Sequence, residues 1–234
     1  IIVVIKPDGL ESQSGKSFAP DMVSEIRKHL ASHPQDIHKL TKETSTASKY
    51  PQPPYVGVIH RLDRPVSGIM VYAKNPKASL STSLQQGKIE KWYQAVICGK
   101  PVDNNGTYVD YLKQDKKNNC SRIVDKSDPE SKRAELEYKV LDCIQTEEKD
   151  PQYLSLVEIK LLTGRHHQIR VQFSGHGTPL YGDGKYGNNE KAVRKSLALC
   201  ACHLKFKHPA TGKIMDFQIK PDTGAFKLFS KSND

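Results

Sequence analysis

The sequence predicts an α+β fold, because segments with the hydrophobic periodicity of strands and of helices are interspersed along the chain. Short apolar runs and strict two-residue alternation, both typical of strands, recur throughout. The wider spacing of an amphipathic helix occurs in separate places. Polar stretches without periodicity occupy residues 33–54 and 103–133. We therefore expect a sheet flanked by helices and loops.

The first half of the chain contains both kinds of element. An apolar run over 1–5 predicts a buried strand, and 21–30 predicts a helix that buries one face (Met22, Val23, Ile26 and Leu30). After a strand at 69–73, Asn75 and Pro76 form a typical helix start. We expect Leu80 and Leu84 to be the buried pair of that helix.

The second half is richer in strands. Alternation or apolar character predicts strands over 91–99, 134–140, 154–162 and 197–206. The stretch 103–133 has the composition of a hairpin-rich surface excursion. Ile169 and Phe173 form an apolar i, i+4 pair on a helix expected to end near Gly175 or Gly177.

Length and charge limit the classes of partner. The 234 residues suffice for one large domain or two small ones. The net charge of +10 favours polyanions such as RNA or DNA, or an anionic membrane face. No apolar run approaches the roughly 18 residues needed to span a bilayer. No signal peptide precedes the first strand, and since the chain begins inside that strand we expect the natural protein to start earlier.

Five cysteines are scattered along the chain without a C-x-x-C pair: Cys98, Cys120, Cys143, Cys200 and Cys202. This pattern argues against a disulfide framework and a zinc ribbon, and favours a reducing cytoplasm. Cys200, Cys202 and His203 could form half of a metal site, but their neighbours indicate a strand. We expect buried thiols and no metal.

Two glycine patterns partly match nucleotide-binding motifs, but each lacks a feature that the motif requires. A P-loop ending at Gly15-Lys16-Ser17 would need glycine at position 10, which is leucine. Residues 182–187 match Gly-x-Gly-x-x-Gly, but they neither follow a predicted strand nor open a predicted helix. We expect no nucleotide cofactor.

The most informative stretch is the motif segment, residues 60–68. Here Asp63 lies among His60, Arg61 and Arg64, and nearby cations favour the ionised form of a carboxylate. The segment leads directly into the strand at 69–73, which we expect to hold the Asp63 carboxylate in a fixed position. An arbitrary Arg-Leu-Asp-Arg would more often form a structural ion pair without chemical consequence.

Two further stretches carry candidate site residues. Tyr93 lies near the start of the strand at 91–99, where taken alone it is an ordinary half-buried strand tyrosine. The four basic residues Arg165, His166, His167 and Arg170 cluster at or near a helix N-terminus, which attracts anions. Taken alone, that cluster indicates phosphate binding.

Together these stretches resemble the RluA-type pseudouridine synthases. The match comprises His-Arg-Leu-Asp-x-x-x-Ser-Gly at 60–68, Lys-x-Tyr-x-Ala-x-Val-x-Gly at 91–99 and Gly-Arg-x-His-Gln-Ile-Arg at 164–170, with Lys-Pro-x-Gly-Leu at 6–10 and Gly-Asp-x-x-Tyr-Gly at 182–187. The ordered set spans residues 3 to about 221. Gln172 stands where the family commonly has histidine, and His166 where it has threonine or serine. We expect Gln172 to affect packing rather than catalysis.

The resemblance implies a mixed, mainly antiparallel sheet flanked by helices and loops, the pseudouridine synthase catalytic fold. It implies one catalytic domain over 1–234, without an appended RNA-binding module, that isomerises uridine to pseudouridine in rRNA or tRNA. By the same resemblance Asp63 is the catalytic carboxylate, Tyr93 stacks on the flipped base and Arg170 pairs with Asp63. The residues expected to bind RNA or assist base flipping are His60, Arg61, Arg64, Arg165 and His167.

The resemblance further implies no metal or other cofactor, RNA as the partner, and a monomer in the cytoplasm. Two alternatives stay open at the level of sequence. A catalytically silent RNA-binding protein would share the basic surface but would have no use for Asp63, Tyr93 and Arg170 together. A nucleic-acid glycosylase would also need a carboxylate and base flipping, but it would release free uracil.

Overall fold

The computed structural model describes residues 1–15, 20–33, 53–84, 88–146, 152–187 and 196–229. Contacts divide the chain into two compact units. Unit 1 comprises Ile1–Ile89 with Phe206–Met215, and unit 2 comprises Glu90–Lys205 with Asp216–Asp234. Most of the polar stretch expected at 33–54, together with Lys16 and Ser17, lies outside the described residues.

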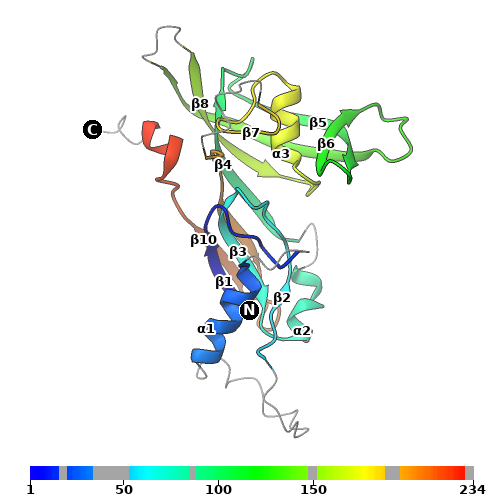
Figure 1. Ribbon diagram of the computed structural model, residues 1–234, viewed down its shortest axis with the longest axis vertical. Coiled ribbons are helices and arrows are strands. Elements are labelled where there is room, and N and C mark those ends of the chain that lie inside the picture. The colour runs from blue at the N-terminus through cyan, green and yellow to red at the C-terminus, as the bar shows by residue number, and fades with distance from the viewer. Residues whose placement is uncertain (16–19, 34–52, 85–87, 147–151, 188–195, 230–234) are drawn as a thin grey trace, which may run out of the picture. The chain divides into compact units, whose positions relative to one another are not determined.

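Unit 1 is built on the buried strand β3 (Ser67–Ala73), with β1 (Ile2–Lys6) and β2 (Gly57–Val58) both antiparallel to it (Figure 1). The continuous apolar run predicted the burial of β3, whose residues 70–73 are fully inaccessible. The registers place Lys6 of β1 opposite Gly68 of β3. The expected strands at 1–5 and 69–73 are confirmed.

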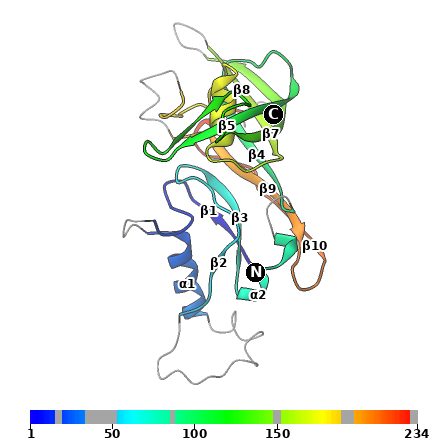
Figure 2. The same cartoon turned by 90° about the vertical axis from the view of Figure 1, so that its right-hand side faces the viewer.

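The first helix, α1 (Met22–Ser32), confirms the amphipathic pattern, since its four predicted apolar residues are buried. Its N-cap is Asp21, whose carboxylate accepts hydrogen bonds from the backbone nitrogens of Val23 (2.8 Å) and Ser24 (3.2 Å). Figure 2 shows α1 running alongside the strands of unit 1.

The second helix, α2 (Pro76–Ser79), starts as expected but is shorter. Asn75 caps it by accepting a hydrogen bond from the nitrogen of Ala78 at 2.8 Å. Leu84 is buried in a separate 3₁₀ turn, η2 (Thr82–Leu84), whereas Leu80 is 79% exposed. The prediction that Leu80 and Leu84 form a buried pair is therefore wrong. Because α2 ends after one turn, the two leucines do not share a helical face.

The segment that follows β1, residues 6–12, holds the motif segment from one side. The Nζ of Lys6 donates to the carbonyl oxygens of Pro7 (2.8 Å), Leu10 (2.7 Å) and Arg64 (3.1 Å). Gly9 and Arg64 are joined twice, since the Gly9 nitrogen donates to the Arg64 carbonyl and the Arg64 Nε donates to the Gly9 carbonyl, both at 2.9 Å. We call residues 6–12 the strap.

At its far end the strap fixes a second residue of the motif segment. The buried Ser12 hydroxyl donates to the carbonyl of Leu62 at 2.7 Å and accepts from its nitrogen at 3.0 Å. Tyr72 in turn donates its hydroxyl to the Ser12 carbonyl at 2.8 Å. The strap therefore fixes the backbone at Leu62 and Arg64, on both sides of Asp63.

Unit 2 is an antiparallel sheet with strand order β9-β4-β8-β7-β5-β6. Its strands are β4 (Glu90–Cys98), β5 (Asn105–Asp115), β6 (Cys120–Val124), β7 (Lys132–Gln145) and β8 (Tyr153–Leu161). Most of β9 (Leu199–Lys207) and of β10 (Ile214–Gln218), which pair with each other, also belongs to this unit. The polar stretch 103–133 forms the hairpin of β5 and β6, as expected. The sheet and the helices confirm the α+β, mainly antiparallel prediction.

Helix α3 (Gln168–Gly175) packs on β5 and β6 (Figure 1). It buries Ile169, Val171 and Phe173. A second apolar cluster forms around Val96 where the 3₁₀ helix η4 (Gly224–Phe229) contributes its phenylalanines.

Gln172 is buried within α3, and its Nε2 donates to the Asp110 carboxylate at 2.8 Å. Residue 172 thus lies among buried groups, and the expectation that its departure from the family motif affects packing rather than catalysis stays a prediction.

No helix in the described part of the chain has the length and apolar character needed to cross a bilayer. Within the same residues the five cysteines are free thiols. Cys200 and Cys202 are buried in β9, as expected.

The bond network at Ser12 predicts a local stability effect. Ser12→Ala would leave both backbone groups of Leu62 without this partner, so we expect a loss of about 1–3 kcal/mol in the free energy of unfolding. Urea unfolding measures that loss, and hydrogen exchange should show faster exchange at the Leu62 amide. Ser32→Ala, which removes an exposed hydroxyl from α1, is the matched control. Unchanged protection of the Leu62 amide would contradict this account.

Candidate active site

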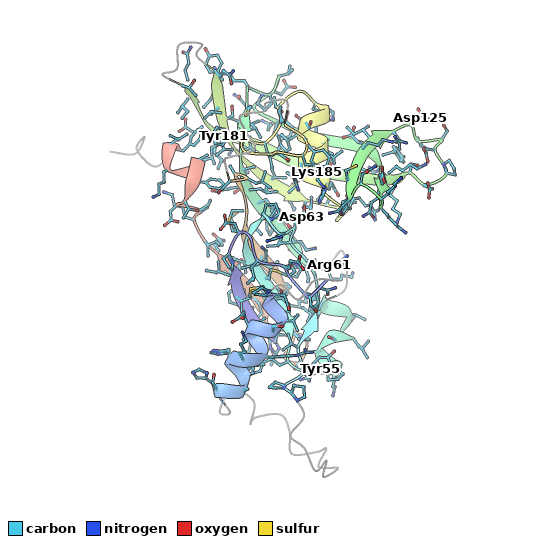
Figure 3. All side chains as sticks on the ribbon, in the orientation of Figure 1. Tyr55, Arg61, Asp63, Asp125, Tyr181 and Lys185 are labelled. Carbon is cyan, nitrogen blue, oxygen red and sulfur yellow. The ribbon has the colours of Figure 1, made fainter. Side chains whose placement is uncertain are left out.

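Asp63 projects from a backbone that is fixed on both sides. Its carbonyl accepts from the Val66 nitrogen at 3.0 Å, which closes a turn, and β3 begins one residue later. Its side chain is partly exposed, whereas Leu62 is buried. Figure 3 labels Arg61 and Asp63 within this segment. The local structure thus presents a carboxylate from a rigid turn, as the sequence predicted.

Lys6 is a neighbour of Asp63 that sequence reasoning did not single out. Burial lowers the pKa of Lys6 to about 8, and the opposing charges of Asp8 and Asp63 only partly offset this. Asp63 therefore has a buried amine in its electrostatic environment within unit 1. The available signal was a lysine directly after the buried strand predicted at 1–5, where a charged side chain needs several acceptors if it is buried too.

The basic residues around Asp63 have different local roles. His60 accepts a hydrogen bond at Nε2 from the Val71 nitrogen at 3.1 Å, so this ring nitrogen carries no proton. Arg61 and Arg64 are exposed, and Arg64 uses its Nε on the strap. Their expected contacts with RNA stay predictions.

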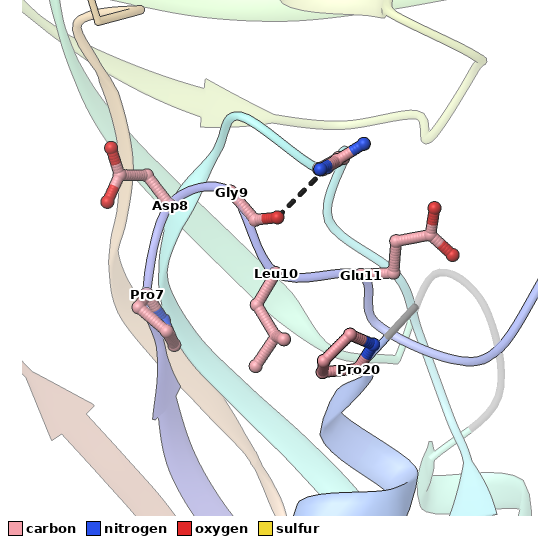
Figure 4. Close-up of a pocket in the computed structure, with 7 residues that line it drawn as sticks. Pro7, Asp8, Gly9, Leu10, Glu11 and Pro20 are labelled. Atoms are coloured by element: carbon pink, nitrogen blue, oxygen red, sulfur yellow. Dashed lines mark hydrogen bonds between the residues drawn. The ribbon is translucent and has the colours of Figure 1, made fainter. Parts of the chain in front are cut away.

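A cavity of about 320 Å³ opens beside the strap (Figure 4). Its lining residues come from the strap, from the approach to α1 and from the motif segment: Pro7, Asp8, Gly9, Leu10, Glu11, Pro20 and Arg64. Asp63 is not among them, so the cavity lies against the backbone that holds Asp63 rather than around its carboxylate.

Tyr93 lies in β4 and is 7% exposed. It stands opposite Ile159 of β8 and Ala201 of β9, directly after an irregularity in the β4–β9 register between Trp92 and Tyr93. Such irregularities redirect side chains and are frequent beside active sites. The stacking role expected for Tyr93 stays a prediction.

Arg170 lies on α3 with its side chain only 7% exposed, and it forms a two-point ion pair with Asp183. Its Nε donates to Oδ2 at 2.8 Å and its Nη2 donates to Oδ1 at 2.7 Å. Sequence reasoning assigned Asp63 as the partner of Arg170. Asp63 belongs to unit 1 and Arg170 to unit 2, so that pairing stays a prediction, while the Asp183 pair was missed.

Asp183 is held ionised by its surroundings. Burial alone would raise the pKa of its carboxyl group, but the hydrogen bonds and charge of Arg170 and the amides of Lys185 and Tyr186 outweigh burial and lower it. These amides donate to Oδ1 at 2.9 Å and 3.0 Å.

His167 caps the start of α3 in the left-handed conformation, with a φ of 53°. Burial, together with the nearby positive charges of His166, Arg170 and Lys185, lowers the pKa of His167 to about 3. Near neutral pH it is therefore an uncharged ring, and the RNA contact expected of it would be a hydrogen bond rather than a charge contact.

Arg165, the other basic residue expected to contact RNA at this helix start, is partly exposed. It donates its Nε to the Arg133 carbonyl at 2.8 Å. Its contact with RNA stays a prediction too.

Solved structures share this fold. Human RNA pseudouridylate synthase domain containing 4 superposes with a TM-score of 0.68 at 22% identity, over 97% of this chain and 88% of that one. Human RNA pseudouridylate synthase domain containing 1 gives 0.61 at 24% identity, over 72% and 70%. At these identities the likeness concerns the fold.

The relatives found by sequence share a higher identity with this chain than these solved structures do. A protein of Aquifex aeolicus (strain VF5) named as an uncharacterized RNA pseudouridine synthase is 32% identical, over 95% of this chain and 67% of its own length. Ribosomal large subunit pseudouridine synthase D of Zymomonas mobilis is 34% identical over 70% and 52%, and synthase C of Rickettsia bellii is 30% identical over 94% and 65%. The chain thus spans about half to two thirds of the length of these relatives.

The family model described as RNA pseudouridylate synthase matches residues 1–175. That range contains the strap, the motif segment, Tyr93 and Arg170. By this match and by its relatives, the chain belongs to the RNA pseudouridylate synthase family.

Proposed function

We propose that this protein isomerises specific uridines in structured RNA to pseudouridine, with Asp63 as the catalytic carboxylate. The observation that carries the proposal is the geometry of the motif segment, in which the strap fixes the residues on both sides of Asp63. Catalytic groups need such fixing, since small misplacements of a reacting group cost large factors in rate.

The reaction requires a carboxylate and no change of oxidation state. The N1–C1′ bond of the uridine breaks, the uracil turns, and C5 forms a new bond to C1′; C5 then gives up its proton and N1 takes one up, so that product and substrate are isomers. A carboxylate assists this sequence either by attacking the nucleoside or by removing a ribose proton. Asp63 has this role.

The remaining site residues act around Asp63. Arg170 pairs with Asp63 and favours its ionised form. Tyr93 stacks on the extruded uracil. Extrusion costs a few kcal/mol of lost stacking, and Arg61 fills the vacated place in the RNA. His60, Arg64, Arg165 and His167 complete the RNA contacts.

The substrate is RNA, since the net charge of +10 favours a polyanion. Two of the relatives are named for the ribosomal large subunit, which favours rRNA over tRNA. The enzyme works as a monomer in the cytoplasm without a cofactor. Incubation with uridine-containing RNA and analysis of the nucleosides tests the reaction: pseudouridine supports it, whereas free uracil or unchanged RNA contradicts it.

The first prediction concerns the carboxylate. Asp63→Asn keeps the side-chain size but removes the anion, so isomerisation should stop while RNA affinity and thermal stability stay close to wild type. Tritium release from RNA carrying 5-tritiated uridine is the readout. Asp125→Asn, in the exposed loop between β6 and β7, is the control. A rate for Asp63→Asn within about tenfold of wild type, or 1.4 kcal/mol in the barrier, would remove Asp63 from this role.

The second prediction concerns Arg170. Arg170→Leu leaves the buried Asp183 without its partner, which should cost about 3–5 kcal/mol of stability. It also removes the cation proposed for Asp63, so the rate should fall about 100-fold and the acidic limb of the rate profile should move to higher pH.

The free energy of unfolding of Arg170→Leu should also change less with falling pH than that of the wild type. In the wild type the lowered pKa of Asp183 stabilises the fold above about pH 4, and this contribution disappears as the pH falls through that lowered pKa. Acid unfolding of both proteins measures the difference. An active Arg170→Leu enzyme with an unshifted acidic limb would show that another cation serves Asp63.

The third prediction separates chemistry from binding. Arg61→Ala should reduce the single-turnover rate much more than the affinity, because Arg61 fills the place of the extruded base. The double variant Lys116→Ala with Lys117→Ala, in the exposed β5–β6 turn, should weaken binding and preserve the rate at saturating RNA. The slope of log K for RNA binding against log salt concentration should become shallower in this variant. The expected change is roughly 0.7–0.9 for each phosphate that is no longer neutralised. Equal loss of affinity in both variants, with a normal rate for Arg61→Ala, would contradict the base-flipping role.

A further inference from the structure

We infer that residues 182–187, the clamp loop, fix the guanidinium of Arg170, with Asp183 and Tyr186 as positioning residues for catalysis. The inference rests on the proposed function, in which Arg170 serves Asp63. Neither Asp183 nor Tyr186 is expected to touch the substrate.

Asp183 determines which edge of the Arg170 guanidinium is engaged in the ion pair and which edge has further donors. Its side chain is 0% exposed and accepts four hydrogen bonds, two from Arg170 and two from the amides of Lys185 and Tyr186. The pair engages Nε and Nη2 of Arg170. A guanidinium has five N–H donors, so the edge formed by Nη1 and Nη2 has donors beyond this pair for a second carboxylate. Asp183 thereby sets the direction in which that edge points.

Tyr186 restricts the guanidinium from another direction. Its ring lies over the group, with the Arg170 Cζ 5.1 Å from the ring centroid. The ring is itself anchored: its hydroxyl accepts from the Ser121 nitrogen at 2.8 Å and lies 2.6 Å from the His167 Nδ1, while its carbonyl accepts from the Ser174 hydroxyl at 2.6 Å. Because the His167 ring is neutral, its contact with the Tyr186 hydroxyl is a hydrogen bond between uncharged groups.

The glycines of the loop make this arrangement possible. Gly182 has a φ of 76°, and a Cβ there would collide with the Ser196 carbonyl oxygen. A Cβ on Gly187 would collide with the carbonyl oxygen of Asp183, which accepts from the Gly187 nitrogen at 2.8 Å. The first and last glycines of the Gly-x-Gly-x-x-Gly pattern, which fails as a dinucleotide fingerprint, thus have a structural role here: they allow the chain to fold tightly around Asp183.

The test compares rate with affinity. In Asp183→Asn one N–H of the new amide faces donors that the carboxylate accepted, and in Tyr186→Leu the ring over Arg170 is removed. We expect the single-turnover rate at saturating RNA to fall about 100-fold in Asp183→Asn, with RNA affinity unchanged. The single-turnover rate should also fall in Tyr186→Leu. It should fall less in Tyr186→Phe, which keeps the ring and removes only the hydroxyl.

A double-mutant cycle shows whether the effect passes through Arg170. In an Arg170→Lys background the ammonium cannot form the two-point pair, so Asp183→Asn should cost much less than in wild type. Asp128→Asn, which breaks the ion pair with Lys113 (3.2 Å) elsewhere in unit 2, is the control and should keep the wild-type rate.

The outcomes are distinct. A folded Asp183→Asn with the wild-type rate, or equal losses in both backgrounds, overturns the clamp. Should Asp183→Asn fail to fold, Tyr186→Leu decides alone, and a wild-type rate in that variant overturns the clamp. Failure of the proposed function is recognised separately, because the wild-type protein itself would then form no pseudouridine.

Discussion

The burial of two cations is the constraint on which the local structure of each unit depends. Among the described residues, Lys6 is the buried lysine or arginine of unit 1 and Arg170 that of unit 2. Removing a cation from water is costly unless hydrogen bonds or an anion replace the lost hydration. Lys6 obtains three carbonyl oxygens, and Arg170 obtains a carboxylate. In both cases the groups that satisfy the cation belong to loops, and satisfying it determines the shape of those loops.

The two solutions differ in chemistry. Carbonyl oxygens are neutral, so the three groups that accept from Lys6 join the strap to the motif segment without adding a charge of their own. Asp183 is charged, so Arg170 and Asp183 together form a dipole whose field falls off faster with distance than that of a lone cation. A second carboxylate would gain from Arg170 chiefly through direct contact. Accurate placement of the guanidinium therefore matters more than its charge alone.

The sequence predicted what depends on periodicity and local chemistry. The strand β3, the helix α1 and the helix α3 follow from the spacing of apolar residues, and the motifs identified the family. Leu80 was predicted wrongly, because apolar spacing does not show that α2 stops after one turn. The partner Asp183 was missed because it depends on how a loop thirteen residues further on folds back, which no periodicity encodes.

The clamp loop shows that a glycine pattern known from nucleotide-binding sites can serve a different structural purpose. Glycine patterns near phosphate sites let a ligand approach the backbone closely. In the clamp loop the groups that approach the glycines are the chain's own backbone carbonyls, since the Gly187 nitrogen donates to the Asp183 carbonyl and side chains at 182 or 187 would collide with carbonyl oxygens. The Asp183 carboxylate accepts from the amides of Lys185 and Tyr186 within the same loop. The ordering of Arg170 is then completed during folding rather than during reaction. A cation fixed in advance needs no reorganisation when charge develops, which is the main advantage of a preorganised site over water.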